Sequence, residues 1–203
     1  MGHLQGRWTS WLAGALGIVR KPLAWMMAGG LLLVFTASSF AYGVHLENND
    51  HFCARCHTEP ESTYVSRTEQ PAVDLASAHA AKAVKCIQCH SGAGTEGRLR
   101  AMMLGARDLT AYLGHHYPQP ATLTHPITDA HCLKCHQDVL RTRTFENHFH
   151  ALLPQWHQVA PSSAATCVSC HTAHTTDGDP RLGWLNKART VARCNACHRI
   201  AGE

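Results

Sequence analysis

The feature that most constrains this 203-residue chain is that its ten cysteines form five identical units, with no cysteine left over. Each unit has two cysteines separated by two residues, and a histidine directly after the second cysteine. The five stretches are CARCH at 53–57, CIQCH at 86–90, CLKCH at 132–136, CVSCH at 167–171 and CNACH at 194–198. The fold must therefore bring the same three side chains together five times.

This spacing is the attachment signature of c-type haem, in which two thiols add to the haem vinyl groups and the adjacent imidazole binds the iron. A structural zinc site combines two cysteine pairs, and five pairs do not divide evenly into four-cysteine sites. Neither zinc sites nor disulfides need a histidine after each cysteine pair. The sequence predicts five covalently attached haem c groups. The attaching residues are Cys53, Cys56, Cys86, Cys89, Cys132, Cys135, Cys167, Cys170, Cys194 and Cys197, and the proximal iron ligands are His57, His90, His136, His171 and His198.

A pool of other histidines can supply the second, distal ligand of each iron, because the chain has seventeen histidines and only five are proximal. The predicted distal ligands are His79, His125, His148, His157 and His174. Two of them lie seven residues before the first cysteine of a motif, one lies ten residues before the fourth motif, and one lies three residues after it. His148 and its neighbour His150 are alternatives, of which we take His148. The substitutes are His45, His51, His115, His116 and His131.

Sulfur ligation has little support after the apolar N-terminal segment, where Met102 and Met103 are the only methionines. Both fall in an amphipathic pattern and are expected to pack in the core. Mostly bis-histidine irons of low potential follow, because methionine ligation raises the potential. The formal charge of +4 becomes about −1 with five ferric haems, and Lys and Arg are scattered, so no nucleic-acid partner is expected.

The N-terminal part contains an uncharged stretch from Leu23 to Val44 that is long enough to cross a bilayer as a helix. Arg7, Arg20 and Lys21 precede it without an acidic residue, so a cytoplasmic N-terminus and a periplasmic haem domain are expected in the inner membrane. The predicted parts are residues 1–22 as a cytoplasmic or interfacial segment, 23–44 as a transmembrane anchor and 45–203 as the haem domain. A cleaved signal peptide is the alternative, because Ser39-Phe40-Ala41 resembles a cleavage site.

The predicted fold is mostly α with extensive irregular structure: a transmembrane helix followed by a haem-cored multihaem cytochrome c domain. About 32 residues for each haem leave little polypeptide to form a core of its own. Helices are expected near residues 96–114 and 137–152, and no useful alternating strand pattern is present.

Residues 20–175 resemble the NapC/NirT family of membrane-anchored multihaem quinol dehydrogenases. The resemblance rests on one N-terminal anchor followed by FCARCHTEPESTYVSR, HAAKAVKCIQCH, GARDLTAYLGH, CLKCH and TCVSCHTAH in that order. It implies electron transfer from membrane quinol to a periplasmic redox partner, such as a nitrite or nitrate reductase. It also implies that Asp108 accepts a quinol proton. The simpler interpretations are a solvated helix carboxylate or a partner of Arg107 or Arg100.

Two departures from the family pattern matter. Glu59 stands where many members have a methionine near the first haem, which leaves the ligation on the quinol side open. The fifth motif is absent from four-haem members and is similar to the pentahaem subunit of alternative complex III, which serves a larger quinol-oxidising assembly. A subunit of that kind without its own quinol site is one alternative function. A catalytic multihaem reductase is another, and surplus histidines argue against its open iron position.

Overall fold

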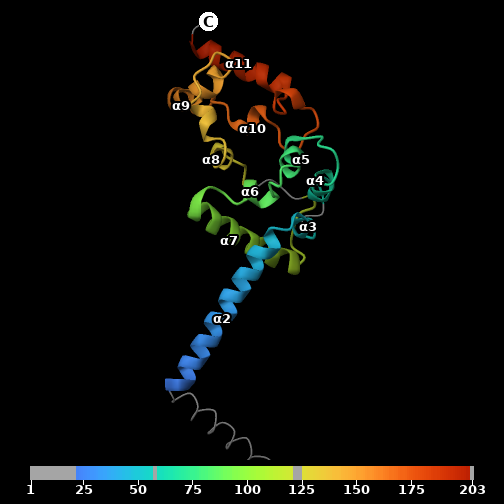
Figure 1. The fold of residues 1–203 in the computed structure, drawn as a ribbon, viewed down its shortest axis with the longest axis vertical. Coiled ribbons are helices and arrows are strands. Elements are labelled where there is room, and N and C mark those ends of the chain that lie inside the picture. The colour runs from blue at the N-terminus through green and yellow to red at the C-terminus, as the bar shows by residue number, and fades with distance from the viewer. Residues whose placement is uncertain (1–21, 57–58, 121–124, 202–203) are drawn as a thin grey trace, which may run out of the picture. The chain divides into compact units, whose positions relative to one another are not determined.

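The computed structural model describes residues 22–56, 59–120 and 125–201, which form helices and connecting loops (Figure 1). No strand occurs in these ranges, where the β pairing consists of isolated bridges from Leu185 to His171 and to Asp179. The predicted mostly helical class is confirmed at this level. The chain divides after Leu46 into two units, 1–46 and 47–203, which are described separately.

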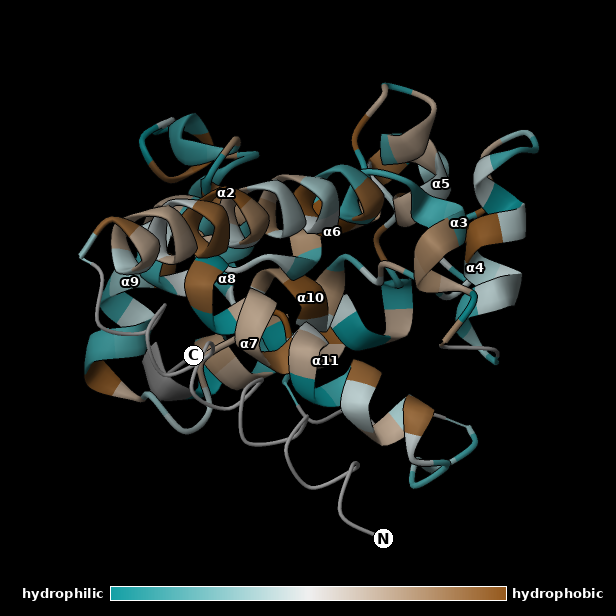
Figure 2. Ribbon diagram, turned by 90° about the horizontal axis from the view of Figure 1, so that it is seen from below, coloured by the Kyte–Doolittle hydropathy of each residue, from teal (hydrophilic) through white to brown (hydrophobic). Residues whose placement is uncertain are grey.

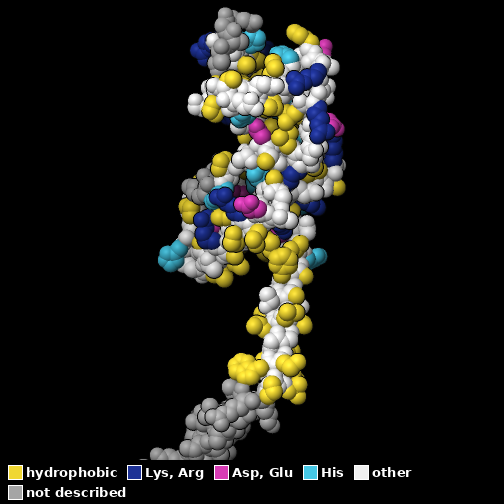
Figure 3. Space-filling model, turned by 90° about the vertical axis from the view of Figure 1, so that its left-hand side faces the viewer, with side chains coloured by type: hydrophobic (Ala, Val, Ile, Leu, Met, Phe, Trp, Pro, Cys, Tyr) yellow, Lys and Arg dark blue, Asp and Glu magenta, His cyan; other side chains and the backbone are white. Residues whose placement is uncertain are grey.

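Helix α2, Pro22–Glu47, contains the predicted membrane-spanning stretch. Its 26 residues correspond to about 39 Å, compared with about 30 Å for the hydrocarbon core of a bilayer. Its side chains are exposed and mainly apolar (Figure 3), and Thr36 Oγ1 donates to the carbonyl of Leu32 at 2.7 Å, which satisfies that hydroxyl inside the helix. The helix is long and apolar enough to cross a membrane. Its orientation and its retention in the mature protein stay predictions.

The second unit consists mainly of short helices joined by loops. Their bounds are α3 Asp50–Cys53, α4 Glu61–Thr68, α5 Leu75–Ala80, α6 Cys86–His90, α7 Gly94–Leu113, α8 Asp129–Leu133, η1 Gln137–Leu140, α9 His148–Val159, α10 Cys167–Cys170, η2 Pro180–Leu182 and α11 Lys187–Ala201. Helix α4 packs against α3 and α5, α8 against α6 and α10, and α10 also against α11. The helices that carry the second, third, fourth and fifth motifs are therefore neighbours in the order of the chain.

The predicted helix near 96–114 is confirmed as α7, which begins two residues earlier. A tight turn precedes it, in which Gly92 has a φ of +70°, and a Cβ at Gly92 would lie 2.8 Å from Gly97 Cα. Glycine is required here both by the backbone conformation and by this close approach. The expectation that both methionines of α7 pack in the core is wrong for Met103, which is 60% exposed.

The single helix predicted for 137–152 is wrong, because residues 141–147 separate η1 from α9. The Asn147 side chain closes this loop by donating from Nδ2 to the carbonyls of Val139 at 2.6 Å and Thr142 at 2.7 Å. An asparagine amide that bonds nearby backbone carbonyls competes with helical hydrogen bonding. Helix α9 starts directly after Asn147 and continues past the predicted end to Val159.

The apolar core of the second unit is small. Leu153 and Trp156 of α9 pack with Ala165, and the surrounding partly buried residues are Leu140, Phe149, Ala160, Ala164, Ala196 and Cys197. Other apolar residues are spread over several short helices instead of forming one continuous layer (Figure 2). Burial of polypeptide alone thus gives this unit few of the contacts that normally offset conformational entropy.

Candidate haem sites

The described residues of each C-x-x-C-H motif lie on about one turn of helix or helix-like backbone. Positions i, i+3 and i+4 fall on one face of a helix, so this spacing brings two thiols and an imidazole together. The carbonyl of the first cysteine accepts from the chain three or four residues later: from Cys56 N at 3.3 Å in the first motif and from His171 N at 2.9 Å in the fourth. His57 lies outside the described residues.

None of the ten cysteines forms a disulfide. Burial and the nearby Asp50 carboxylate raise the pKa of Cys86 to about 12 and also raise the pKa of Cys53. A hydrogen bond between the thiols of Cys132 and Cys167 lowers the pKa of Cys132 to about 7 and raises that of Cys167. The first and second motifs, and the third and fourth, therefore hold their thiols close enough to interact.

Three of the four described proximal histidines lie opposite a second histidine from another part of the chain. His90 lies opposite His174, His136 opposite His79, and His171 opposite His150. The ring centroids are 6.3, 6.1 and 6.1 Å apart in that order, and the ring planes are inclined by 23°, 86° and 21°. The predicted ligands His79 and His174 belong to these pairs, whereas the predicted ligand His148 does not.

These separations fit an iron held between two imidazoles. Bonds between a metal of this size and an imidazole nitrogen are about 2.0–2.1 Å long, and that nitrogen lies about 1.2 Å from its ring centroid, so two axial imidazoles have centroids about 6.4 Å apart. Two imidazoles that held one iron would be able to take any angle between their ring planes. No group of three or more His, Cys, Asp or Glu suited to a metal ion occurs in the described ranges.

Hydrogen bonds at Nδ1 set the tautomer of three rings in these pairs. His79 Nδ1 donates to the Leu75 carbonyl at 2.8 Å, His171 Nδ1 to the Gly183 carbonyl at 2.7 Å, and His150 Nδ1 to Asn147 Oδ1 at 2.9 Å. Because the oxygen in each bond can only accept, Nδ1 carries the proton and Nε2 keeps a free lone pair. A second partner of this kind is how proteins orient histidines that bind metals.

His174 is held by a buried polar network between α4 and α5. Its ring stacks on Tyr64 with centroids 4.2 Å apart and planes inclined by 12°. Arg67 Nη1 donates to the His174 carbonyl at 2.9 Å and to Asp74 Oδ2 at 3.1 Å, and Asp74 is 1% exposed. Burial, followed by the neighbouring His90, lowers the pKa of His174. His174 Nδ1 is buried without a hydrogen-bond partner.

The pKa of His150 is lowered as well, by burial and then by His171. A lowered pKa keeps an imidazole neutral near pH 7, and the neutral form is the one that binds iron. A signal for His150 was present in the helical periodicity of α9: positions 150, 153 and 157 share one face, and Leu153 on that face is buried. His148 points elsewhere, since it is exposed, stacks on Phe145 and bonds the Phe145 carbonyl through Nδ1 at 2.6 Å.

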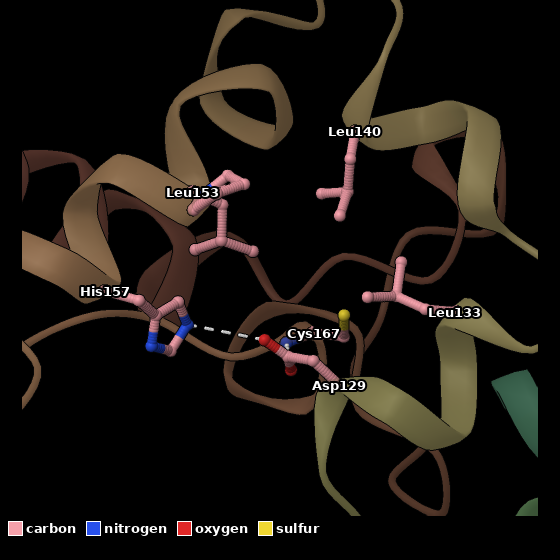
Figure 4. A pocket seen from close by; sticks show the side chains of 7 residues that line it. Asp129, Leu133, Leu140, Leu153, His157 and Cys167 are labelled. Atoms are coloured by element: carbon pink, nitrogen blue, oxygen red, sulfur yellow. Dashed lines mark hydrogen bonds and ion pairs between the residues drawn. The ribbon is translucent and has the colours of Figure 1, made fainter. Parts of the chain in front are cut away.

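His157 lies at the wall of an apolar cavity of about 210 Å³ between the third and fourth motifs (Figure 4). Its Nε2 is 3.4 Å from Asp129 Oδ2, within ion-pair distance but without hydrogen-bond geometry. The remaining lining residues are Leu133, Leu140, Leu153, Pro154 and Cys167. Cys167, the first cysteine of the fourth motif, belongs to this lining. His125 is exposed on the loop before α8, and His198 is exposed on α11.

A polar contact joins the first motif to the second, and another joins the second to the third. The backbone N–H of Cys86 donates to Asp50 Oδ1 at 3.1 Å. Lys134, inside the third motif, donates from Nζ to the carbonyls of Gln88, inside the second motif, and of Gly92, the latter at 2.8 Å.

The later motifs are linked in the same sequential way. The backbone N–H of Cys167 donates to Asp129 Oδ1 at 2.7 Å. Asn186 donates its N–H to the Cys170 carbonyl at 3.0 Å and accepts from the first turn of α11, at Arg189 N, through Oδ1 at 2.9 Å. Because α11 carries the fifth motif, the motifs are connected in space in their order along the chain.

Asp108 lies on α7 with its side chain 42% exposed, and its Oδ1 accepts from Arg107 Nη2 at 3.3 Å. This contact agrees with the simpler interpretation of Asp108 as a partner of Arg107. Glu59, at the position of the family methionine, accepts from Thr63 Oγ1 at 3.0 Å and from Ser62 Oγ, and these hydrogen bonds lower its pKa.

No protein-family model, no curated protein and no solved structure matches this chain.

Proposed function

We propose that this chain is a membrane-anchored pentahaem c-type cytochrome that relays electrons from the quinol pool, or from a quinol-oxidising partner, to a periplasmic acceptor. The observation that carries the proposal is the set of three histidine pairs, each with one histidine of a C-x-x-C-H motif. A sequence motif alone requires one imidazole next to two thiols. A second imidazole at the separation of an axial ligand pair is an independent geometric match to the same cofactor.

The proposed ligation by two histidines also suits electron transfer. When bound, haem iron takes up and releases single electrons, and two histidine ligands leave it without an open position for substrate. His79, His150 and His174 are the proposed distal ligands of the third, fourth and second motifs. His125 and His157 stay predictions for the remaining irons. A catalytic reductase needs an iron with an open axial position, so a second histidine ligand on every iron would argue against it.

The side chains that link consecutive motifs support a relay. Four residues each form a hydrogen bond with the backbone of a neighbouring motif: Asp50, Lys134, Asp129 and Asn186. Close, fixed spacing between cofactors is what electron transfer between them requires, and the protein's part is to fix position. The small core is explained as well, because bound porphyrins would supply the apolar surface that the polypeptide lacks.

Direction and location follow from the N-terminal segment and the resemblance to the NapC/NirT family. Positive residues before α2 and Glu47 and Asp50 after it support a single-pass inner-membrane protein with a periplasmic haem domain. The first motif follows the anchor closely and is the proposed entry for electrons. The fifth motif on α11 is the proposed exit toward a periplasmic redox protein.

A second candidate is an electron-transfer subunit of a larger quinol-oxidising complex of the alternative complex III type. The contact between Asp108 and Arg107 favours it, because the carboxylate that the family resemblance assigns to quinol already accepts a hydrogen bond from its neighbour on α7. In this case electrons arrive from a partner subunit, and the chain has no quinol site of its own.

The experiment is to produce the full chain in a host that attaches c-type haem, purify it in detergent and determine its intact mass and haem content. Five haems for each chain and low-spin bis-histidine spectra are expected. The protein alone is then mixed with a menaquinol analogue. Reduction supports a quinol dehydrogenase, and reduction only within a co-purified complex supports the second candidate. A chain that carries no covalent haem contradicts both.

A further inference from the structure

An aspartate precedes two of the five motifs by the same distance. Asp50 lies three residues before Cys53 and Asp129 three residues before Cys132, in DHFCARCH and DAHCLKCH. The corresponding positions of the second, fourth and fifth motifs hold Ala83, Ala164 and Val191. The repeat is thus confined to the first and third motifs.

The two aspartates make the same contact with the following motif. Asp50 Oδ1 accepts the backbone N–H of Cys86 at 3.1 Å, and Asp129 Oδ1 accepts the backbone N–H of Cys167 at 2.7 Å. Cys86 and Cys167 are the first residues of α6 and α10, so these N–H groups are among those that a helix leaves unpaired at its start. A carboxylate from the preceding motif satisfies each of them.

The second carboxylate oxygen also has matching surroundings. Asp50 Oδ2 is 3.7 Å from Lys85 Nζ, and Asp129 Oδ2 is 3.4 Å from His157 Nε2. The two side chains are only 11% and 20% exposed. Hydrogen bonds from a backbone N–H to a shielded carboxylate are among the stronger ones in proteins, so each contact can fix a backbone position.

We infer that Asp50 and Asp129 are equivalent positioning residues, each holding the first cysteine of the following motif, so that residues 50–90 and 129–171 are two copies of one two-motif unit. The inference rests on the proposed function, because what is positioned is a haem attachment site. The lengths agree with it: Cys86 follows Cys53 by 33 positions, and Cys167 follows Cys132 by 35 positions. The fifth motif lies outside both units and is attached through Asn186.

This arrangement predicts that the two aspartates act on different haems. Removing Asp50 should disturb the geometry at the second motif, whose proximal histidine is paired with His174. Removing Asp129 should disturb the fourth motif, whose proximal histidine is paired with His150. The amide oxygen of asparagine can still accept the cysteine N–H, so asparagine should preserve most of the geometry.

The test uses electron paramagnetic resonance of the oxidised, haem-loaded full chain. His174→Ala and His150→Ala first identify the signals of the second and fourth motifs by abolishing their low-spin character. Asp50→Ala is expected to shift the signal of the second motif and to leave that of the fourth motif unchanged. Asp129→Ala is expected to shift the signal of the fourth motif and to leave that of the second motif unchanged. Asp50→Asn and Asp129→Asn should keep five haems and the wild-type signals. The control is Asp138→Ala, since that side chain is 95% exposed, and no signal should change.

The inference is overturned if both alanine variants shift the same signals, or if neither shifts any. It is also overturned if the asparagine variants shift the signals as much as the alanine variants do. Loss of a haem in an asparagine variant overturns it too, and this outcome can be measured even if an alanine variant does not accumulate. A wild-type chain without covalent haem overturns the proposed function itself. A loaded wild-type chain with nonselective variants overturns only the positioning role.

Discussion

The imidazole rings of His150 and His171 lie opposite each other, with centroids 6.1 Å apart and planes inclined by 21°. Helix α9 supplies the first ring, and the histidine directly after α10 supplies the second. The pair joins the fourth motif to the segment before it. It favours His150 over His148, two residues earlier in the chain, as the proposed distal ligand.

His150→Ala is expected to convert one of the five irons from low spin to high spin, because one axial ligand is lost. That iron should then bind an added ligand such as imidazole, which should restore the low-spin spectrum. Optical and paramagnetic resonance spectra measure the change. His148→Ala is the matched control on the same helix and should leave all five irons low spin. The opposite result would make His148 the ligand.

His79→Met should raise the midpoint potential of one haem by on the order of 100 mV, because a thioether ligand favours ferrous iron relative to imidazole. A spectroelectrochemical titration resolves this as one component that moves upward while the others stay in place. Leu113→Met is the control, since that residue is 69% exposed at the end of α7. An unchanged titration for His79→Met would remove His79 from the ligand set.

Asp74→Ala should lower the free energy of unfolding by about 2–4 kcal/mol, because it removes a helix cap and leaves the Arg67 cation without its partner. Asp74 Oδ1 accepts from Ser77 N at 2.8 Å and Asp74 Oδ2 from Arg67 Nη1 at 3.1 Å, with the carboxylate almost fully buried. Denaturant unfolding of the haem-loaded protein, followed by circular dichroism, measures the loss.

Asp74→Asn separates the two contributions of Asp74, because asparagine can still accept from Ser77 but carries no charge. Its loss of stability should be smaller than that of the alanine variant. The low-spin signal of the haem that His174 serves should shift in Asp74→Ala, since Arg67 also bonds the His174 carbonyl. An alanine variant within about 0.5 kcal/mol of the wild type would contradict a structural role for this network.

Asp177 should make the stability of the loop before α11 depend on pH. Hydrogen bonds from Thr175 and then Asn186 hold the pKa of Asp177 below its ordinary value of 3.8. Because the pKa of Asp177 is lower in the folded protein, its carboxylate stabilises the fold at pH values above the ordinary pKa. This stabilisation is lost as the pH falls through the lowered pKa of the folded protein. The melting temperatures of wild type and Asp177→Asn should therefore differ at neutral pH and converge below about pH 4.

Thermal unfolding at a series of pH values measures this convergence. The exposed Asp138→Asn serves as the control and should show little difference from wild type at neutral pH. A difference between wild type and Asp177→Asn that stays constant across the series would show that the Asp177 carboxylate does not carry the effect.

The helices illustrate what local sequence can predict and where it fails. The uncharged stretch of α2 and the amphipathic pattern of α7 were sufficient to locate those helices, because both depend on periodicity along one segment. The break between η1 and α9 depends on the Asn147 side chain, which bonds carbonyls several residues away. The exposure of Met103 depends on which elements cover α7. Neither is encoded in the local pattern.

The sequence by itself determined which cofactor to expect, since five C-x-x-C-H motifs with no leftover cysteine predict covalent haem and five proximal ligands wherever the motifs lie. Only the tertiary structure brought His150 opposite His171, and Asp50 and Asp129 against the motifs that follow them. The reason is physical: attachment needs residues within one helical turn, whereas axial pairing and motif spacing join residues that are far apart in the chain. Those contacts depend on how the helices pack.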